Sequence, residues 1–185
     1  IYEDETAFGG DQDGDGPRWW YYGSYTICCD FGPPSIDFCE TAYAKGGWVW
    51  TTGRRSNPER LPSLELTRNR WGWAFKIDAP GTTVADIWAG AGLNNTSKGT
   101  LVGTLTIDWD GANVTVSYAM AGIYFMTEAH IWAADAAPDT IAPGQYGYVL
   151  GFDPGVNYHS ADFEVTDELG DGIWVVAHAV ACVPA

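Results

Sequence analysis

Acidic side chains alternate with small residues near the start of the chain, in the stretch DQDGDG at residues 11–16. Asp11, Asp13 and Asp15 can direct several oxygens at one point, and Gly16 lets the backbone curl so that carbonyl groups can join them. Ca²⁺ prefers about six to eight such oxygen ligands. An EF-hand loop that began at Asp11 would need its closing glutamate at Tyr22, so an EF-hand is excluded.

A calcium site at this stretch therefore needs a carboxylate from elsewhere, and Glu3, Glu5 or another copy of the chain could supply it. The alternative is a solvated acidic linker, and we favour Ca²⁺ binding. A second acidic turn holds Asp167, Glu168 and Asp171, and here we favour an ordinary charged hairpin tip over a cation site.

The histidines offer a different chemistry. Glu128 and His130 alternate along an expected strand and so share one face, which allows a two-residue metal or acid–base pair. His178 lies in another expected strand and His159 in an expected loop. The alternative, which we favour, is that these imidazoles are hydrogen-bonded in the core. Because the sequence contains no P-loop, HExxH, GxSxG or GxGxxG context, we do not expect an enzyme.

Exposed aromatic and arginine side chains are expected to form an interface. Neighbouring residues of a strand alternate faces, so the run Trp19, Trp20, Tyr21, Tyr22 cannot lie entirely in a core. Protein interfaces favour Trp, Tyr and Arg, and sugar rings also stack on such platforms. The stretch 53–70 is rich in Arg and Pro and is predicted to be an exposed excursion carrying Arg54, Arg55 and Arg70.

Four cysteines, Cys28, Cys29, Cys39 and Cys182, predict two disulfides in an exported protein. A bond between the adjacent Cys28 and Cys29 would be strained, so each is expected to pair with Cys39 or Cys182. One bond would then tie the C-terminal strand to the N-terminal third across a loop of about 150 residues. Zinc is the weaker alternative because the spacing lacks a CxxC pair.

Composition limits the classes of partner. The formal charge of −15 excludes nucleic acid and anionic membranes as default partners. No apolar run reaches the roughly 20 residues of a membrane span. Because the first residue is Ile1, we expect a mature chain after signal cleavage, located outside the cell or on its surface. Basic residues concentrate in 45–76, and the acidic C-terminal half could neutralise them within one fold or between copies.

Alternating hydrophobicity, rather than a helical period, dominates the chain. Segments 100–110 and 112–120 flank an Asp110-Gly111 turn and predict a hairpin. Further strands are expected near 18–31, 41–52, 72–78, 83–90, 123–134, 161–166 and 173–183. About nine or ten short strands favour an all-β antiparallel sandwich or jelly roll over residues 18–185, with residues 1–17 as an extended acidic N-terminal arm.

Several fragments in a fixed order support a resemblance: ETAYA (40–44), NRWGW (69–73), DIWAGAGLNNTSKGTLVGTLTID (86–108), TEAHIWA (127–133), APGQY (142–146) and GIWVVAHAVAC (172–182). Together they resemble a group of secreted bacterial β-rich surface or matrix domains. The resemblance implies a structural protein and supplies no catalytic residues. Members often have cysteines at the places of Leu93-Asn94 and of Phe125-Met126, which this chain lacks, so their disulfides do not transfer.

These observations lead to two hypotheses. The first is a secreted structural protein that assembles with copies of itself into a filament or matrix, with Ca²⁺ bridging acidic loops. The second is a Ca²⁺-assisted carbohydrate-binding or adhesion module that uses exposed Trp and Tyr side chains on a polysaccharide.

Overall fold

The computed structural model of the chain describes residues 4–13, 20–26 and 36–185, with side chains over 36–185. It divides into two units, Ile1–Pro34 and Ser35–Ala185 (the body), so the boundary predicted between residues 17 and 18 falls inside the first unit. In the first unit, β1 (Asp4–Asp13) and β2 (Trp20–Thr26) pair antiparallel as a two-stranded sheet, with an irregular register between Ala7 and Asp11. Within the segment expected at 18–31, residues 20–26 thus pair with β1 and not with the body's sheet.

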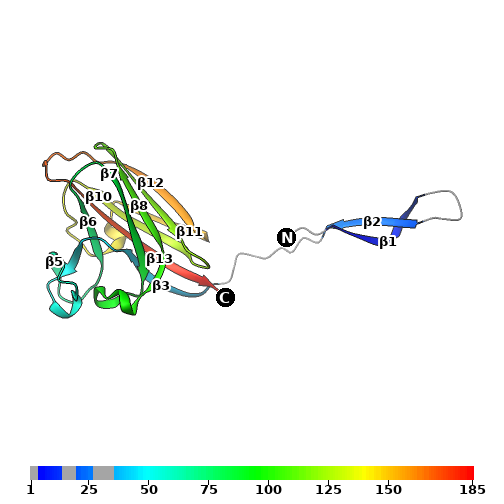
Figure 1. Ribbon diagram of the computed structural model, residues 1–185, viewed down its shortest axis with the longest axis horizontal. Coiled ribbons are helices and arrows are strands. Elements are labelled where there is room, and N and C mark those ends of the chain that lie inside the picture. The colour runs from blue at the N-terminus through cyan, green and yellow to red at the C-terminus, as the bar shows by residue number, and fades with distance from the viewer. Residues whose placement is uncertain (1–3, 14–19, 27–35) are drawn as a thin grey trace. The chain divides into compact units, whose positions relative to one another are not determined.

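The body is all-β, as predicted, and its described residues contain no α-helix. Its eleven strands form one sheet, one or two more than expected (Figure 1). The strands are β3 (Ile36–Ala44), β4 (Trp48–Thr51), β5 (Ser63–Thr67), β6 (Trp73–Ile77), β7 (Gly81–Ala89), β8 (Thr100–Trp109), β9 (Asn113–Met120), β10 (Phe125–Ala134), β11 (Tyr148–Val156), β12 (Tyr158–Glu164) and β13 (Ile173–Pro184). Among the described residues, no helix is long and apolar enough to cross a membrane.

The sheet forms a sandwich-like arrangement around a main core. An antiparallel run β12-β9-β8-β7 continues through a short β7–β3 pairing into β3-β13-β10-β11. The predicted β8–β9 hairpin is present, and the Asp110 carboxylate at its turn accepts hydrogen bonds from the amides of Ala112 and Asn113. The main core draws apolar side chains from both runs, including Leu105, Ile107, Val116, Ile131 and Val175.

The central strand β13 is buried on both of its faces. Val175 and Ala177 face the main core, whereas Trp174 and Val176 belong to a second, aromatic-rich cluster. This second cluster also contains Trp50, Trp73 and Tyr146, so it gathers side chains from segments far apart in the sequence.

The stretch 53–70 covers part of the second cluster. It contains a 3₁₀ turn at Arg54–Ser56 and the strand β5, which runs parallel to β4. Leu61, Leu64 and Leu66 pack against the cluster while the arginines remain exposed. The stretch 53–70, which was predicted to be exposed, is therefore exposed through its arginines and partly buried through its leucines.

Candidate functional site

Two histidines lie directly opposite each other in the β10–β13 ladder. His130 and His178 are register partners, so both side chains lie on the face of the sheet that carries the second cluster. Both are buried, with 6% and 5% of their surface exposed, and their Nδ1 atoms are 2.9 Å apart. One imidazole therefore donates a hydrogen bond to the other, which agrees with the interpretation of hydrogen-bonded core histidines.

A tyrosine from the opposite layer fixes the backbone beneath the pair. The side chain of Tyr118, on β9, extends across the main core. Its hydroxyl donates a hydrogen bond to the carbonyl oxygen of His178 at 3.1 Å. The carbonyl oxygen of His130 is 3.4 Å from the same hydroxyl. Because Tyr118 is fully buried, these contacts hold the backbones of β10 and β13 at a fixed distance from β9 across the core.

Glu128 shares a strand face with His130, as the sequence predicted, and its Oε2 lies 3.6 Å from Nε2 of His130. This distance is an electrostatic contact rather than a hydrogen bond. The carboxylate favours a proton on Nε2 of His130, which leaves its Nδ1 to accept the hydrogen bond from Nδ1 of His178. Burial lowers the pKa of His178 to about 3, with His130 as a smaller cause. Burial also lowers the pKa of His130, against the opposing effect of Glu128, so both rings are neutral near pH 7.

The histidine pair and Glu128 line a cavity of about 620 Å³. On the wall formed by β3, Tyr43 packs against the ring of His178 with centroids 4.8 Å apart. Trp71 packs edge-on against Tyr43 at 5.2 Å, and Arg70 is exposed beside it. The remaining lining residues are Thr41, Ile141, Ala142, Pro143 and Gly144. The cavity thus combines aromatic surface with one cation, one carboxylate and two neutral imidazoles.

The backbone at Gly72 positions Arg70 and Trp71. Gly72 has φ +152°, and a Cβ there would lie 1.6 Å from Nε1 of Trp50. Its amide donates to Oδ1 of the buried Asn94 at 2.8 Å, and Nδ2 of Asn94 donates to the carbonyl oxygen of Ser56 at 2.6 Å. One asparagine therefore joins the 53–70 stretch, the 90–99 turn and the start of β6.

The predicted calcium ligands fall mostly outside the part described in side-chain detail. Asp11, Asp13 and Glu5 lie in β1, where a turn was expected around Asp11 and Asp13, and Glu3 and Asp15 lie outside the described residues. Within the described part, one other acidic group could hold an ion: oxygens of Asp135, Asp167 and Asp171 lie within 4.8 Å of one another. The carboxylate of Asp167 accepts hydrogen bonds from the amides of Asp171 and Gly172. The carboxylate of Asp171 forms an ion pair with Lys76 at 2.8 Å. The turn connects β12 to β13, which do not pair with each other, so it is a charged connection between strands and not the hairpin tip that the sequence suggested.

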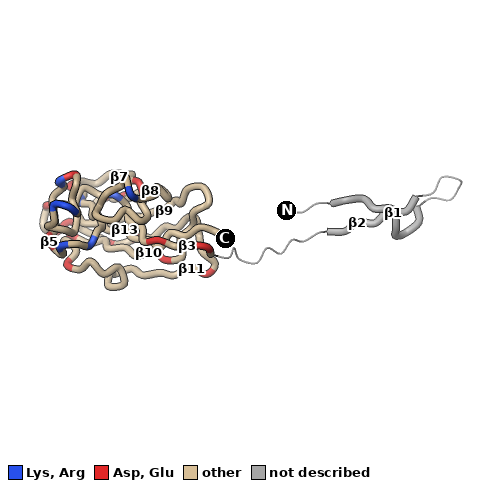
Figure 2. The backbone as a smooth tube through the Cα atoms, turned by 90° about the horizontal axis from the view of Figure 1, so that it is seen from below, with Lys and Arg blue, Asp and Glu red and all other residues tan. Residues whose placement is uncertain are grey.

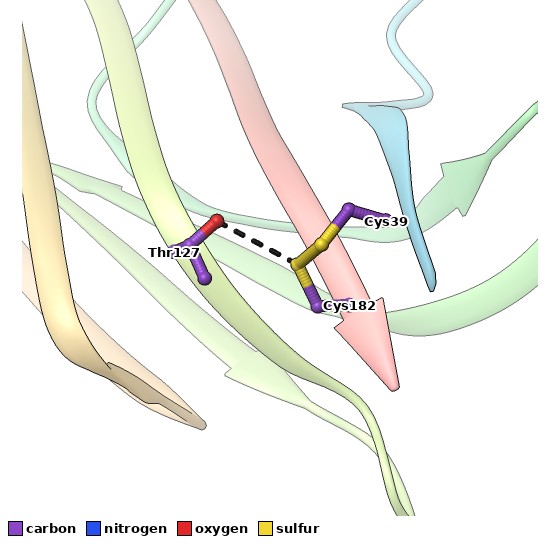
Figure 3. The surroundings of a disulfide bond; sticks show 3 residues. All are labelled: Cys39, Thr127 and Cys182. Atoms are coloured by element: carbon purple, nitrogen blue, oxygen red, sulfur yellow. Dashed lines mark hydrogen bonds between the residues drawn. A yellow bond between two sulfur atoms is a disulfide. The ribbon is translucent and has the colours of Figure 1, made fainter. Parts of the chain in front are cut away.

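The predicted cysteine pairing, in which Cys28 and Cys29 bond to Cys39 and Cys182, is wrong. Cys39 bonds to Cys182, with Cα atoms 4.1 Å apart, so neither is available to Cys28 or Cys29, which lie outside the described residues. The reason is register: Cys39 on β3 and Cys182 on β13 are direct cross-strand partners. Figure 3 shows the bond, with the hydroxyl of Thr127 on β10 lying 3.6 Å from Sγ of Cys182. A bond between the C-terminal strand and the N-terminal third was correctly expected, and its sequence separation is 143.

The predicted interface residues divide between the two units. Trp20 and Tyr22 lie in β2, and Trp19 lies outside the described residues. Arg54 and Arg55 are exposed in the 3₁₀ turn, and Arg70 lies at the cavity. Figure 2 shows that Lys and Arg gather at the end of the body that holds β5. Within residues 36–185, none of the five arginines forms an ion pair with a carboxylate, which leaves a basic patch of Arg54, Arg55, Arg60, Arg68 and Arg70.

The fragments that carried the family resemblance converge on the cavity. Ten of its eleven lining residues come from ETAYA, NRWGW, TEAHIWA, APGQY and GIWVVAHAVAC, with Ile141 as the exception. The sequence analysis did not predict that these residues meet in one cavity. Their common occurrence in the fragments that carry the resemblance was a signal that could have indicated it. Comparison with protein-family models, with curated proteins and with solved structures finds no match, so the resemblance stays a prediction.

Proposed function

We propose that the chain is a secreted structural subunit that assembles with copies of itself, the N-terminal hairpin β1–β2 of one copy joining the sheet of the next. The role is architectural rather than catalytic. The observation that carries the proposal is an interrupted pairing along β3. β13 pairs with β3 from Ile36 to Tyr43, whereas β7 pairs only with Ala42–Ala44.

The first half of β3 therefore offers an open edge. The residues Ile36–Glu40 have no strand partner on the side away from β13 among the described residues. Ile36 and Phe38 are 52% and 58% exposed there, so two large apolar side chains remain uncovered at this edge. Unpaired edges of this kind commonly accept a strand from another chain. We assign this place to a β1–β2 hairpin from a second copy.

The hairpin supplies the other half of the proposal. Among the described residues, β1 and β2 pair only with each other. A two-stranded hairpin is marginally stable alone in water, so it gains stability by adding to a larger sheet. The Cys39–Cys182 disulfide fits an extracellular location, where disulfides persist.

Electron microscopy and sedimentation of the full chain, with and without Ca²⁺, test the proposal. Filaments or large oligomers are expected. A variant lacking residues 1–34 should remain monomeric, and Phe38→Lys should block assembly because it places a charge on the apolar edge. Val84→Lys is the matched control, because Val84 is 63% exposed on β7 and lies outside that edge. A wild-type chain that stays monomeric at high concentration in Ca²⁺ would contradict the proposal.

A carbohydrate-binding or adhesion module is the second candidate, and the cavity is the observation that favours it. Its volume of about 620 Å³ suits a small ligand, and Trp71 and Tyr43 with Arg70 and Glu128 offer the aromatic and hydrogen-bonding groups that bind sugars. Trp71→Ala should then abolish retention of the monomer on polysaccharide columns without changing assembly. Retention that is equal in this variant and the wild type would exclude the cavity as a sugar site.

A further inference from the structure

The paired histidines carry a second inference, independent of the proposed assembly. We propose that Nδ1 of His130 and Nδ1 of His178 bind one divalent copper ion at the wall of the cavity. The two nitrogens come from register partners on adjacent strands, and the backbone beneath them is held by Tyr118. The site is thus part of the rigid sheet and does not depend on a loop.

The chemistry of the ligands selects the kind of metal. Both ligand atoms are imidazole nitrogens, and they lie 2.9 Å apart, so a small movement brings both to the metal–imidazole bond length of about 2.0–2.1 Å from one ion. Square-planar or tetragonal coordination by nitrogen and oxygen is typical of Cu²⁺ and Ni²⁺, and Cu²⁺ has the highest affinity of the divalent first-row metals for such ligands.

One of the two nitrogens already has the form that a metal needs. Nδ1 of His130 accepts the hydrogen bond from Nδ1 of His178, so it carries a lone pair and no proton. On metal binding, His178 gives up its Nδ1 proton and takes one at Nε2, which has no hydrogen-bond partner among the described residues. A rotation of each ring about its Cβ–Cγ bond then directs both lone pairs to one ion.

Glu128 and the cavity complete the environment. The carboxylate near Nε2 of His130 keeps the proton on that nitrogen and leaves Nδ1 as the ligand, an arrangement common behind metal-bound histidines. The cavity that both histidines line has room for water or a small oxygen ligand at the remaining coordination positions. Arg70 at the cavity attracts an anionic ligand to these positions.

Titration calorimetry of the full chain with Cu²⁺, in the presence of a weak competing chelator, tests the inference. One Cu²⁺ per chain is expected, with affinity reduced at least about tenfold in His130→Ala and in His178→Ala. His159→Ala is the matched control, because His159 is the third histidine of the chain and bonds the hydroxyl of Tyr148 on another part of the sheet. Glu128→Gln should weaken binding about tenfold, as the loss of a group that orients a ligand does.

Electron paramagnetic resonance of the wild-type chain keeps the inference testable if a histidine variant fails to fold. A tetragonal Cu²⁺ signal with coupling to two imidazole nitrogens is expected at one equivalent of metal. Zn²⁺ binding as tight as that of Cu²⁺ would overturn the assignment of the site to copper. Equal Cu²⁺ affinity in the wild type and the His130→Ala/His178→Ala double variant would show that the pair is a hydrogen bond only.

Discussion

At the residue scale, the arrangement of the cavity depends on a glycine that no other residue can replace. The indole of Trp50 lies where a side chain at position 72 would have to be, 1.6 Å from an added Cβ, and φ at Gly72 is +152°. Gly72→Ala is therefore expected to destabilise the body by several kcal/mol, about the upper end for a single core substitution. Urea denaturation followed by tryptophan fluorescence measures the effect.

The matched control for this substitution is Gly47→Ala. An added Cβ at Gly47 meets nothing within 4 Å, and its φ lies outside the left-handed region. Its free energy of unfolding should stay within about 0.5 kcal/mol of the wild type, as is usual for exposed sites. Equal losses in the two variants would show that glycine content, rather than contact with Trp50, decides the stability.

Titration of His178 should make the stability depend on pH. Its pKa is about 3 in the folded chain against an ordinary value of 6.5. Between these values the unfolded chain binds a proton that the folded chain excludes, so the free energy of unfolding falls as the pH falls from about 6.5 toward 3. This one group changes the free energy of unfolding by at most about 1.4 kcal/mol per pH unit.

Urea denaturation at several pH values in this range measures the dependence. Replacement by an uncharged side chain, His178→Gln, should flatten the curve relative to the wild type, because carboxylates titrate alike in both chains. Stability curves that run parallel would mean that His178 accepts a proton in the folded state without cost.

The sequence predicted one half of the histidine site and could not predict the other. Alternation along a strand was enough to place Glu128 and His130 on one face. The pairing of His130 with His178, 48 residues away, depends on the register between β10 and β13, which local patterns do not encode. The same limit explains the cysteines, since Cys39 meets Cys182 by register.

At the element scale, the predicted strands are those with regular alternation or a clear turn. β11 was missed because Asp153-Pro154-Gly155 indicates a turn, yet β11 pairs only with β10, and an edge strand tolerates proline. β13 was found although it is buried on both faces, because its continuous apolar run has the length of a strand. The covering role of 53–70 was missed because its three leucines are spread among charges and prolines.

β1 provides the calcium prediction at this scale. If Asp11, Asp13 and Asp15 act with Glu3 and Glu5 as one site, calorimetry should detect Ca²⁺ binding that Asp13→Ala removes almost entirely. Asp171→Asn is the control, because Asp171 belongs to the separate group with Asp135 and Asp167. If Ca²⁺ binding is lost in the control alone, the Ca²⁺ site lies at the turn before β13 and not in the N-terminal unit.

At the scale of the whole molecule, charge is distributed unevenly between the two units. Residues 1–34 carry seven acidic side chains and one basic side chain, a formal charge of −6, while the body holds the exposed basic patch. Copies that repel at −15 each need opposed charges or cations where they meet. We predict that Arg54→Glu/Arg55→Glu weakens assembly and that high salt weakens it partly in the wild type.

Lys98→Glu is the control for the basic patch. Lys98 is also exposed and, within residues 36–185, forms no ion pair, but it lies in a different turn. Sedimentation velocity of each variant at low and moderate salt compares them. Assembly weakened equally by all of these substitutions would indicate a response to net charge alone.

The cross-strand disulfide also decides how an assembled subunit would respond to tension. A pull transmitted through the hairpin enters the body at the start of β3 and peels that strand from β13. Ile36 separates first from Pro184 and Phe38 next from Val183, and the following pair is the covalent one, Cys39 and Cys182. Peeling therefore stops after three residues, and the force passes into β13, the strand that both cores enclose. A chain of such subunits would stretch at its joints while each body kept its shape.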